Sequence, residues 1–277
     1  MINVVSEMMS YPFIVRAMIV GILVSLCSSL LGVSLVLKKY SMIGEGLSHV
    51  SFGAIAIAVA LGVSPLKLSI PIVVIVAFLL LRIKESSKIK GDSAIALISS
   101  SSLAIGVISI AITTGMNTDV CNYMFGSILA MSKNDVYLSV VLSIVVIFLF
   151  TIYYNKIFAI TFDENFTKST GINVNFYNMM IAILTAITIV LGMRMMGAML
   201  ISSLIIFPSI ISMKIFKSFK SVVMSSGIVS ILSFCIGMII SYKFSTPTGA
   251  SIVVVNIIIF ILSIIVEKVK SNNRSYI

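Results

Sequence analysis

Charged residues are scarce in this chain. Asp, Glu, Lys and Arg together make up 10% of its 277 residues, whereas soluble domains average about 25%. The apolar fraction is 59% and the mean hydropathy is +1.20. Too little polar surface is available to cover a water-soluble globule. Soluble enzymes and disordered proteins are therefore excluded, and a multi-pass membrane protein is predicted.

The chain also lacks several catalytic and ligand-binding motifs. It has one His and three Cys, and it contains no phosphate loop of the Gly-x-x-x-x-Gly-Lys-Ser/Thr type. A His-Glu-x-x-His pair and a Gly-x-Ser-x-Gly elbow are absent as well. The chain is therefore not expected to bind ATP through a phosphate loop or to be an enzyme. Cys27, Cys121 and Cys235 are scattered single thiols, which predict neither a disulfide framework nor a metal-ligand pair.

Long apolar runs are what the chain has in abundance. A helix needs about 20 apolar residues to cross a bilayer. The charge-free stretches predict eight or nine spans in an all-α, polytopic transmembrane helical bundle. The candidates are Ala17–Leu37, Gly46–Leu66, Lys67–Arg82, Ser93–Thr118, Val136–Asn155, Ser169–Met193, Met195–Met213, Ser221–Tyr242 and Phe244–Val266. The apolar stretch Asn122–Met131 is too short to span and is predicted to be a re-entrant or interfacial helix.

The distribution of basic residues orients these spans. With the N-terminus outside and nine helices alternating in direction, fourteen of the 19 Lys and Arg residues fall inside. The other five, which fall outside, are Arg16, Lys67, Lys133, Arg194 and Lys243. This asymmetry predicts a cell-membrane protein with a cytoplasmic C-terminus, and it explains the net charge of +10 without nucleic acid. Residues 1–270 are expected to form one membrane domain, and Ser271–Ile277 a disordered tail.

Two ionisable residues lie four positions apart near the start of the second span. Glu45 and His49 would project from the same face of a helix, and ionisable groups within spans usually mark function. A carboxylate and an imidazole at this spacing can share a divalent cation. The alternative is a Glu–His hydrogen bond near the headgroups. Because two ligands are too few for a transition metal, a two-fold dimer with four ligands would suit tetrahedral zinc, whereas manganese more often takes additional oxygen ligands.

Several short motifs, in order from about residue 12 to 267, resemble those of the zinc/manganese/iron-type ABC uptake permeases. The stretch around Glu45 and His49 is similar to that family's Gly-Asp-x-Leu-Ser/Ala-His signature. The matching segments are Leu37–His49, Lys90–Ile95, Tyr123–Leu129, Phe162–Glu164 with Gly171, Met196–Leu200 with Phe207–Pro208, and Thr246–Ala250.

The resemblance implies a permease that carries Zn²⁺, Mn²⁺ or Fe²⁺ inward as its substrate and binds no cofactor of its own. It implies three partners: a separate ATPase subunit, an extracytoplasmic metal-binding protein and a second permease protomer, expected to be identical. The family's metal pair transfers to Glu45 and His49, with Glu in place of the usual Asp. The run Val50–Gly53 is more similar to zinc members than to manganese members, so zinc is favoured.

The resemblance also places a coupling element in the cytoplasmic connector of residues 155–175. Asp163 is expected to cap a short helix, with Glu164 in its first turn and Gly171 closing it. Phe166 would be an apolar knob that fits a pocket on the ATPase. The alternative is an ordinary solvated loop with a local helix.

A self-sufficient secondary transporter or cation channel is the rival hypothesis. It would require inverted repeats and several intramembrane carboxylates, and only Glu45 is clearly so placed. At the outer side, Asp119 is expected to be a capping or cation-receiving residue, Lys133 and Asp135 to mark a helix start, and Arg194 to anchor an outer loop or act in gating.

Overall fold

The protein, represented by a computed structural model, is described over residues 7–86, 91–113 and 133–272. These residues form helices joined by short turns, with no strand among them. The helices are α2 (Pro12–Leu37), α3 (Ser41–Ala60), α4 (Pro65–Ser86), α5 (Gly91–Thr113), α7 (Lys133–Ile152), α8 (Tyr154–Phe162), α9 (Glu164–Ser169), α10 (Val174–Met196), α11 (Ala198–Ile215), α12 (Phe219–Phe244) and α13 (Thr248–Asn272).

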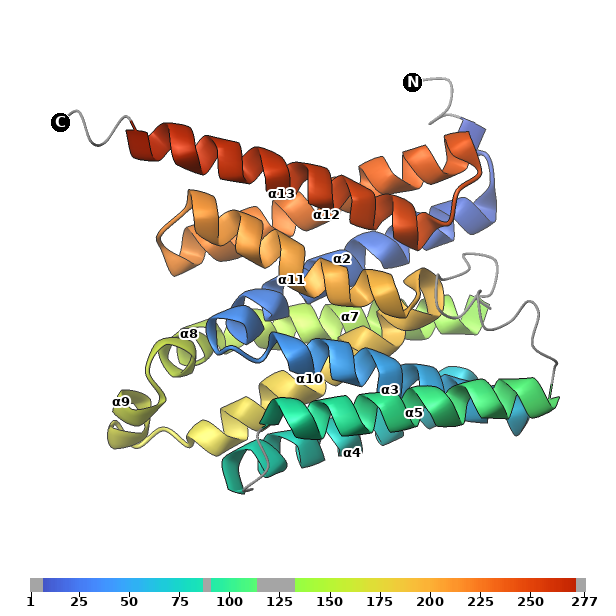
Figure 1. The fold of residues 1–277 in the computed structure, drawn as a ribbon, viewed down its shortest axis with the longest axis horizontal. Coiled ribbons are helices and arrows are strands. Elements are labelled where there is room, and N and C mark those ends of the chain that lie inside the picture. Colours follow the sequence, from blue (N-terminus) through green and yellow to red (C-terminus); the bar gives the residue numbers. More distant parts are fainter. Residues whose placement is uncertain (1–6, 87–90, 114–132, 273–277) are drawn as a thin grey trace.

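Within the described ranges, nine of these helices are long and apolar enough to cross a membrane. All except the short α8 and α9 belong to this set, which confirms the predicted all-α membrane bundle. Their directions alternate along the chain, so α8, α9 and the C-terminal end of α13 lie at the opposite end of the bundle from the N-terminus (Figure 1). The positive-inside rule assigns the end carrying α8 and α9 to the cytoplasm.

Three predicted spans, the second, sixth and ninth, are displaced by about one to two helical turns, and the ninth occupies Thr248–Asn272 rather than Phe244–Val266. The second begins at Ser41 rather than Gly46 and ends at Ala60 rather than Leu66, because Gly62 takes a left-handed conformation at φ 66°. The sixth begins at Val174 rather than Ser169, because Gly171 at φ 82° separates it from α9. Hydropathy counts the apolar residues of such turns as part of a span, whereas backbone geometry ends the helix there.

A single residue separates α10 from α11. Gly197 has φ 83° and ψ 165°, a backbone conformation that residues with a Cβ rarely adopt. Its N–H still donates to the carbonyl of Met193, 2.8 Å away, and completes the last turn of α10. The chain therefore reverses direction at the outer end of the bundle with no intervening loop.

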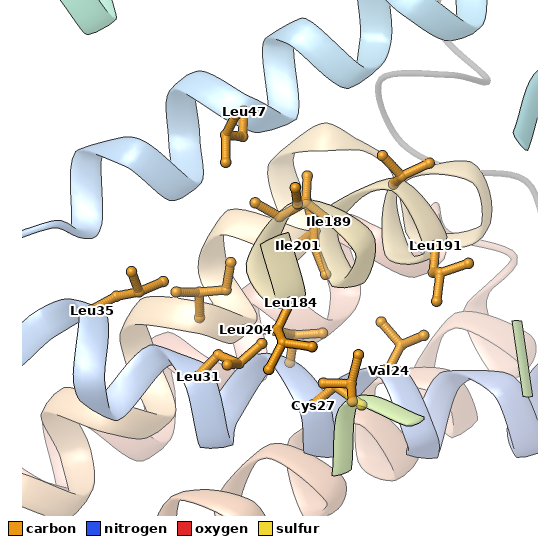
Figure 2. Packing of buried hydrophobic residues seen from close by; sticks show 14 of the residues in the cluster. Val24, Cys27, Leu31, Leu35, Leu47, Leu184, Ile189, Leu191, Ile201 and Leu204 are labelled. Carbon is orange, nitrogen blue, oxygen red and sulfur yellow. The ribbon is translucent and has the colours of Figure 1, made fainter. Parts of the chain in front are cut away.

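The centre of the bundle is α2, which packs against α7, α10, α11 and α12. Figure 2 shows its apolar side chains Val24, Cys27, Leu31 and Leu35 facing residues from α3, α10 and α11. Polar contacts supplement this packing, since the Ser226 and Ser230 hydroxyls of α12 donate to backbone carbonyls of α2. Small polar residues allow helices to approach closely in lipid.

An ion pair joins α7 to α10 at the outer end. Nη2 of Arg194 lies 3.1 Å from Oδ2 of Asp135, and both side chains are largely buried. Asp135 is in the first turn of α7, as predicted, but Arg194 belongs to the last turn of α10 instead of lying between two spans. The interpretation of Arg194 as a loop anchor at the headgroups is therefore wrong, because its charge is directed inward at a carboxylate.

We expect Asp135→Asn to lower the melting temperature of the purified protein substantially. The substitution leaves the Arg194 charge buried without this counter-charge, which costs about 3–5 kcal/mol in comparable sites. Differential scanning fluorimetry in detergent measures the change. Lys133→Ala, at an exposed position in the same helical turn, is the control and should melt like the parent; equal melting temperatures for both variants would contradict the prediction.

Candidate functional site

The joint between α2 and α3 fixes where the candidate metal-binding helix begins. Lys39 has a left-handed backbone at φ 58°, and its N–H donates to the carbonyl of Val36 at 3.0 Å. The N–H of Tyr40 donates to the carbonyl of Leu35 at 2.7 Å. These two bonds form a Schellman motif, which ends one helix and redirects the chain. The next helix, α3, therefore starts after only three linking residues, with little freedom in its direction.

Glycines set the distance between α3 and its neighbours. A Cβ at Gly46 would lie 2.6 Å from Cγ2 of Ile95, and one at Gly53 would lie 2.5 Å from the carbonyl oxygen of Ser102, both on α5. A Cβ at Gly44 would lie 3.4 Å from Cδ1 of Ile205 on α11, which is an ordinary contact. Thus α3 lies in direct backbone contact with α5 and faces α11 on another side.

Glu45 projects between these two contacts. Successive residues of a helix are rotated by about 100°, so Glu45 points between the direction of Gly44, which faces α11, and that of Gly46, which faces α5. Its side chain is exposed. His49 lies one turn further along the same face of α3 and is half-buried. The line of residues on this face that begins with Glu45 and His49 is called the stripe below. The predicted common face of the two residues is therefore present and opens between α5 and α11.

The imidazole of His49 has a nitrogen that nothing in the described chain satisfies. Nδ1 is enclosed and has no hydrogen-bond partner among the described residues. Nδ1 of His49 therefore makes no hydrogen bond to Glu45. A buried imidazole nitrogen without a partner is costly, and a passing cation would satisfy its lone pair if this nitrogen is unprotonated.

Apolar residues close the stripe on the outer side of His49. Phe52 and Ala56 continue the stripe and are buried in a cluster with Ile110 of α5, Met193 of α10 and Ala198 of α11. On the side toward α11, the hydroxyl of Ser202 donates to that of Ser48 at 3.3 Å. The accessible part of the stripe therefore lies on the predicted cytoplasmic side of Phe52.

One chain provides two metal-ligating groups at this place. Among the described residues, no group of three or more His, Cys, Asp or Glu side chains is close enough to hold a metal ion. Asp119 and the short helix predicted at Asn122–Met131 lie outside the described residues. Two ligands would provide only a weak contact to a metal ion, as a transport site requires.

The predicted local geometry of the cytoplasmic connector is present. Oδ1 of Asp163 accepts from the N–H of Phe166 at 2.9 Å, so Asp163 caps α9, and Glu164 is in the first turn. Gly171, at φ 82°, follows the end of α9. The Phe166 side chain is 66% exposed. Sequence reasoning did not predict α8, which packs its aromatic residues Phe158 and Phe162 against Phe219 of α12.

Sequence reasoning also missed a polar cluster beside α9. Nζ of Lys38 lies 2.6 Å from Oε1 of Glu164 and donates to Oδ1 of Asn178. The amide of Asn178 donates in turn to Oε1 of Glu164 at 3.3 Å. Asn178, a buried amide in the second turn of an apolar span, was the available signal, since polar groups there require partners.

A family model describes most of this chain. The model of the ABC 3 transport family matches residues 10–267. The chain belongs to the ABC 3 transport family. This confirms the sequence prediction of an ABC permease and of a transporter subunit rather than an enzyme, and it weighs against a self-sufficient transporter or channel.

Individual known proteins are similar to this chain over nearly its full length. The manganese import system permease protein ScaB of Streptococcus gordonii is 28% identical, and the match covers 91% of each chain. The high-affinity zinc uptake system membrane protein ZnuB of Buchnera aphidicola is 30% identical over 91% of this chain and 97% of that protein. Among solved structures, PsaBC from Streptococcus pneumoniae in complex with Fab matches with a TM-score of 0.85 at 28% identity, covering 95% of each chain. The prediction of a metal-importer permease is thus confirmed for the family, and the chain is a multi-pass plasma-membrane protein.

The glycine contacts of α3 give a testable difference between two similar substitutions. Gly53→Ala should destabilise the protein by about 1–3 kcal/mol, because the new methyl group would press on the backbone of α5. Gly44→Ala meets only an ordinary contact and should be tolerated. Thermal unfolding of the two variants in the same detergent measures the difference; equal effects would show that the spacing of α3 and α5 is not set at Gly53.

Proposed function

We propose that this chain is the permease of an ABC importer for divalent transition-metal ions, with Zn²⁺ as the favoured substrate. The observation that carries the proposal is the pair on α3: an exposed Glu45 carboxylate and, one turn away, a His49 nitrogen without a partner in the described chain. Oxygen and imidazole ligands bind zinc well. Relatives named for both manganese and zinc transport support the metal class, while the choice of zinc rests on the ligand set and on the Val50–Gly53 run.

The coordination is completed by a second copy of the chain. Two protomers related by a two-fold axis would contribute two Glu45 and two His49 side chains, which gives the four ligands that zinc prefers. The opening of the stripe between α5 and α11 leaves Glu45 accessible for this arrangement. An extracytoplasmic metal-binding protein delivers the ion to the outer end of the bundle, and alternating access releases it into the cytoplasm.

A separate ATPase subunit supplies the energy and docks on α9. The support is the 66% exposed Phe166 on a capped helix at the predicted cytoplasmic end. Exposed aromatic side chains are favoured anchors of protein interfaces. In this arrangement Asp163 and Gly171 hold the helix ends, and Glu164 and Phe166 occupy its first turn.

The metal pathway is tested by His49→Ala. Loss of one ligand should reduce zinc uptake at least tenfold, since changes to mere partners of ligands already cost about 10–100-fold in affinity. Uptake of radioactive zinc and manganese into proteoliposomes containing permease, ATPase and binding protein measures the effect and decides which ion is carried. Leu61→Ala, exposed at the outer end of α3, is the control. Parental uptake of both metals by His49→Ala would refute the pathway.

The docking role is tested by Phe166→Asp. Replacing the exposed ring by a charge should weaken ATPase binding about tenfold or more, while membrane insertion is unchanged. Co-purification and titration with the ATPase in detergent give the result. Asn165→Asp places the same charge at the adjacent exposed position without removing the ring and serves as the matched control. If Phe166→Asp binds the ATPase as tightly as the parent, Phe166 is no anchor.

A further inference from the structure

We propose that Lys38, Glu164 and Asn178 form a latch that transmits the movement of the ATPase-docking helix α9 to the start of α3. The inference rests on the proposed function of α9. It extends that function to residues that connect α9 to α3 without contacting the metal. Lys38 is the C-cap residue of α2, Glu164 is the first residue of α9, and Asn178 lies in the second turn of α10. Three segments far apart in the sequence thus meet in one polar cluster.

The geometry makes the latch specific. Nζ of Lys38 is shared between the carboxylate of Glu164, at 2.6 Å, and the amide oxygen of Asn178, and the amide nitrogen of Asn178 returns to the same carboxylate at 3.3 Å. Every pair of the three side chains is therefore in contact. Displacing α9 must either carry Lys38 and Asn178 with it or separate these charge-assisted bonds, which are the strong kind.

Burial makes separation costly. The Lys38 side chain is only 5% exposed, and it lines a small cavity whose walls include the apolar Leu35, Ile43 and Ile181. A lysine charge in such surroundings depends on its counter-charge. The Glu164 side chain is 42% exposed, so its other edge is available to a protein that docks on α9. The Lys38 side chain is buried beneath Glu164 and does not face a docking protein. Its role is therefore to hold Glu164 in place, not to contact the ATPase.

The backbone then carries the displacement to the metal pair. Lys38 and α3 are joined by Lys39 and Tyr40 alone, and the two hydrogen bonds of the Schellman motif hold this joint. Glu45 follows the first residue of α3 by four positions, a rise of about 6 Å. A shift of Lys38 is therefore transferred to Glu45 through one tight turn and one turn of helix, with no flexible loop between them.

A second ion pair at the same end of the bundle provides a matched control. Nζ of Lys214 and Oε2 of Glu267 also lie 2.6 Å apart, but this pair joins α11 to α13 and does not include α9. Removing its carboxylate deletes an equally short ion pair while leaving the latch intact. A general effect of a lost surface charge would therefore appear on removal of either the Glu164 or the Glu267 carboxylate. An effect on coupling would appear only on removal of the Glu164 carboxylate.

The experiment compares Glu164→Gln, Lys38→Met and Glu267→Gln in proteoliposomes with the ATPase and the binding protein. For Lys38→Met, which changes a side chain that is only 5% exposed, we expect normal ATPase binding. For both latch variants we expect retained ATP hydrolysis and a fall of about tenfold in metal imported per ATP hydrolysed. Glu267→Gln should keep the parental ratio. The double variant Lys38→Met/Glu164→Gln should be no worse than either single variant, because both act on one interaction.

A readout that needs no metal separates failure of the latch from failure of the proposed function. Hydrogen exchange of residues 41–49 should change when ATP and vanadate are added to the parental permease–ATPase complex, and this change should be lost in Lys38→Met. If Lys38→Met fails to fold, Asn178→Ala takes its place. The proposal would be overturned if the latch variants kept both the parental ratio of metal to ATP and the parental exchange response. Loss of ATPase binding by Lys38→Met would also overturn it, because the cluster would then only support docking.

Discussion

The close approach of α3 to α5 is the constraint on which the candidate site depends. Gly46 and Gly53 leave no room for a Cβ against α5, so α3 is held at a fixed distance and rotation about its own axis. This rotation decides which residues point into the space between α5 and α11. If α3 were turned by one residue position, about 100°, Glu45 would point at a neighbouring helix and its carboxylate would be buried without a partner.

Charges within the bundle are placed where helices end. The pair Arg194–Asp135 joins α10 to α7 at the outer end, and Lys38–Glu164 joins the α2–α3 joint to α9 at the predicted cytoplasmic end. Between these ends the buried polar groups are chiefly hydroxyls and a few amides. Some of the hydroxyls, such as those of Thr185, Thr188 and Ser209, donate to backbone carbonyls of the preceding helical turn. Glu45 and His49 depart from this pattern, since neither is neutralised by a charged partner in the described chain. Ionisable residues within spans usually mark function, and this is the reason for proposing the metal pathway at this pair.

Hydropathy and charge asymmetry were sufficient to predict eight or nine spans and their alternation, because lipid permits few architectures other than apolar helices. The common face of Glu45 and His49 also followed from helical periodicity alone. The ends of α3 and α10 did not, since Gly62 and Gly171 end their turns through backbone conformation, which hydropathy does not measure. The ion partners of Arg194 and Lys38 were out of reach for another reason: both lie far away in the sequence, and only the packing of the helices brings them together. The predicted disordered tail stays a prediction, although α13 continues through Asn272.

The single-residue link at Gly197 determines how α10 and α11 can move relative to each other. Their outer ends are joined through one residue, so they are held within a few ångströms. Their inner ends have no such tether, because α10 continues into the connector after α9 and α11 into the turn before α12. Relative motion of the two helices therefore amounts to a hinge rotation about Gly197 at the outer end of the bundle. Any widening between them is largest on the cytoplasmic side, where an imported ion must leave.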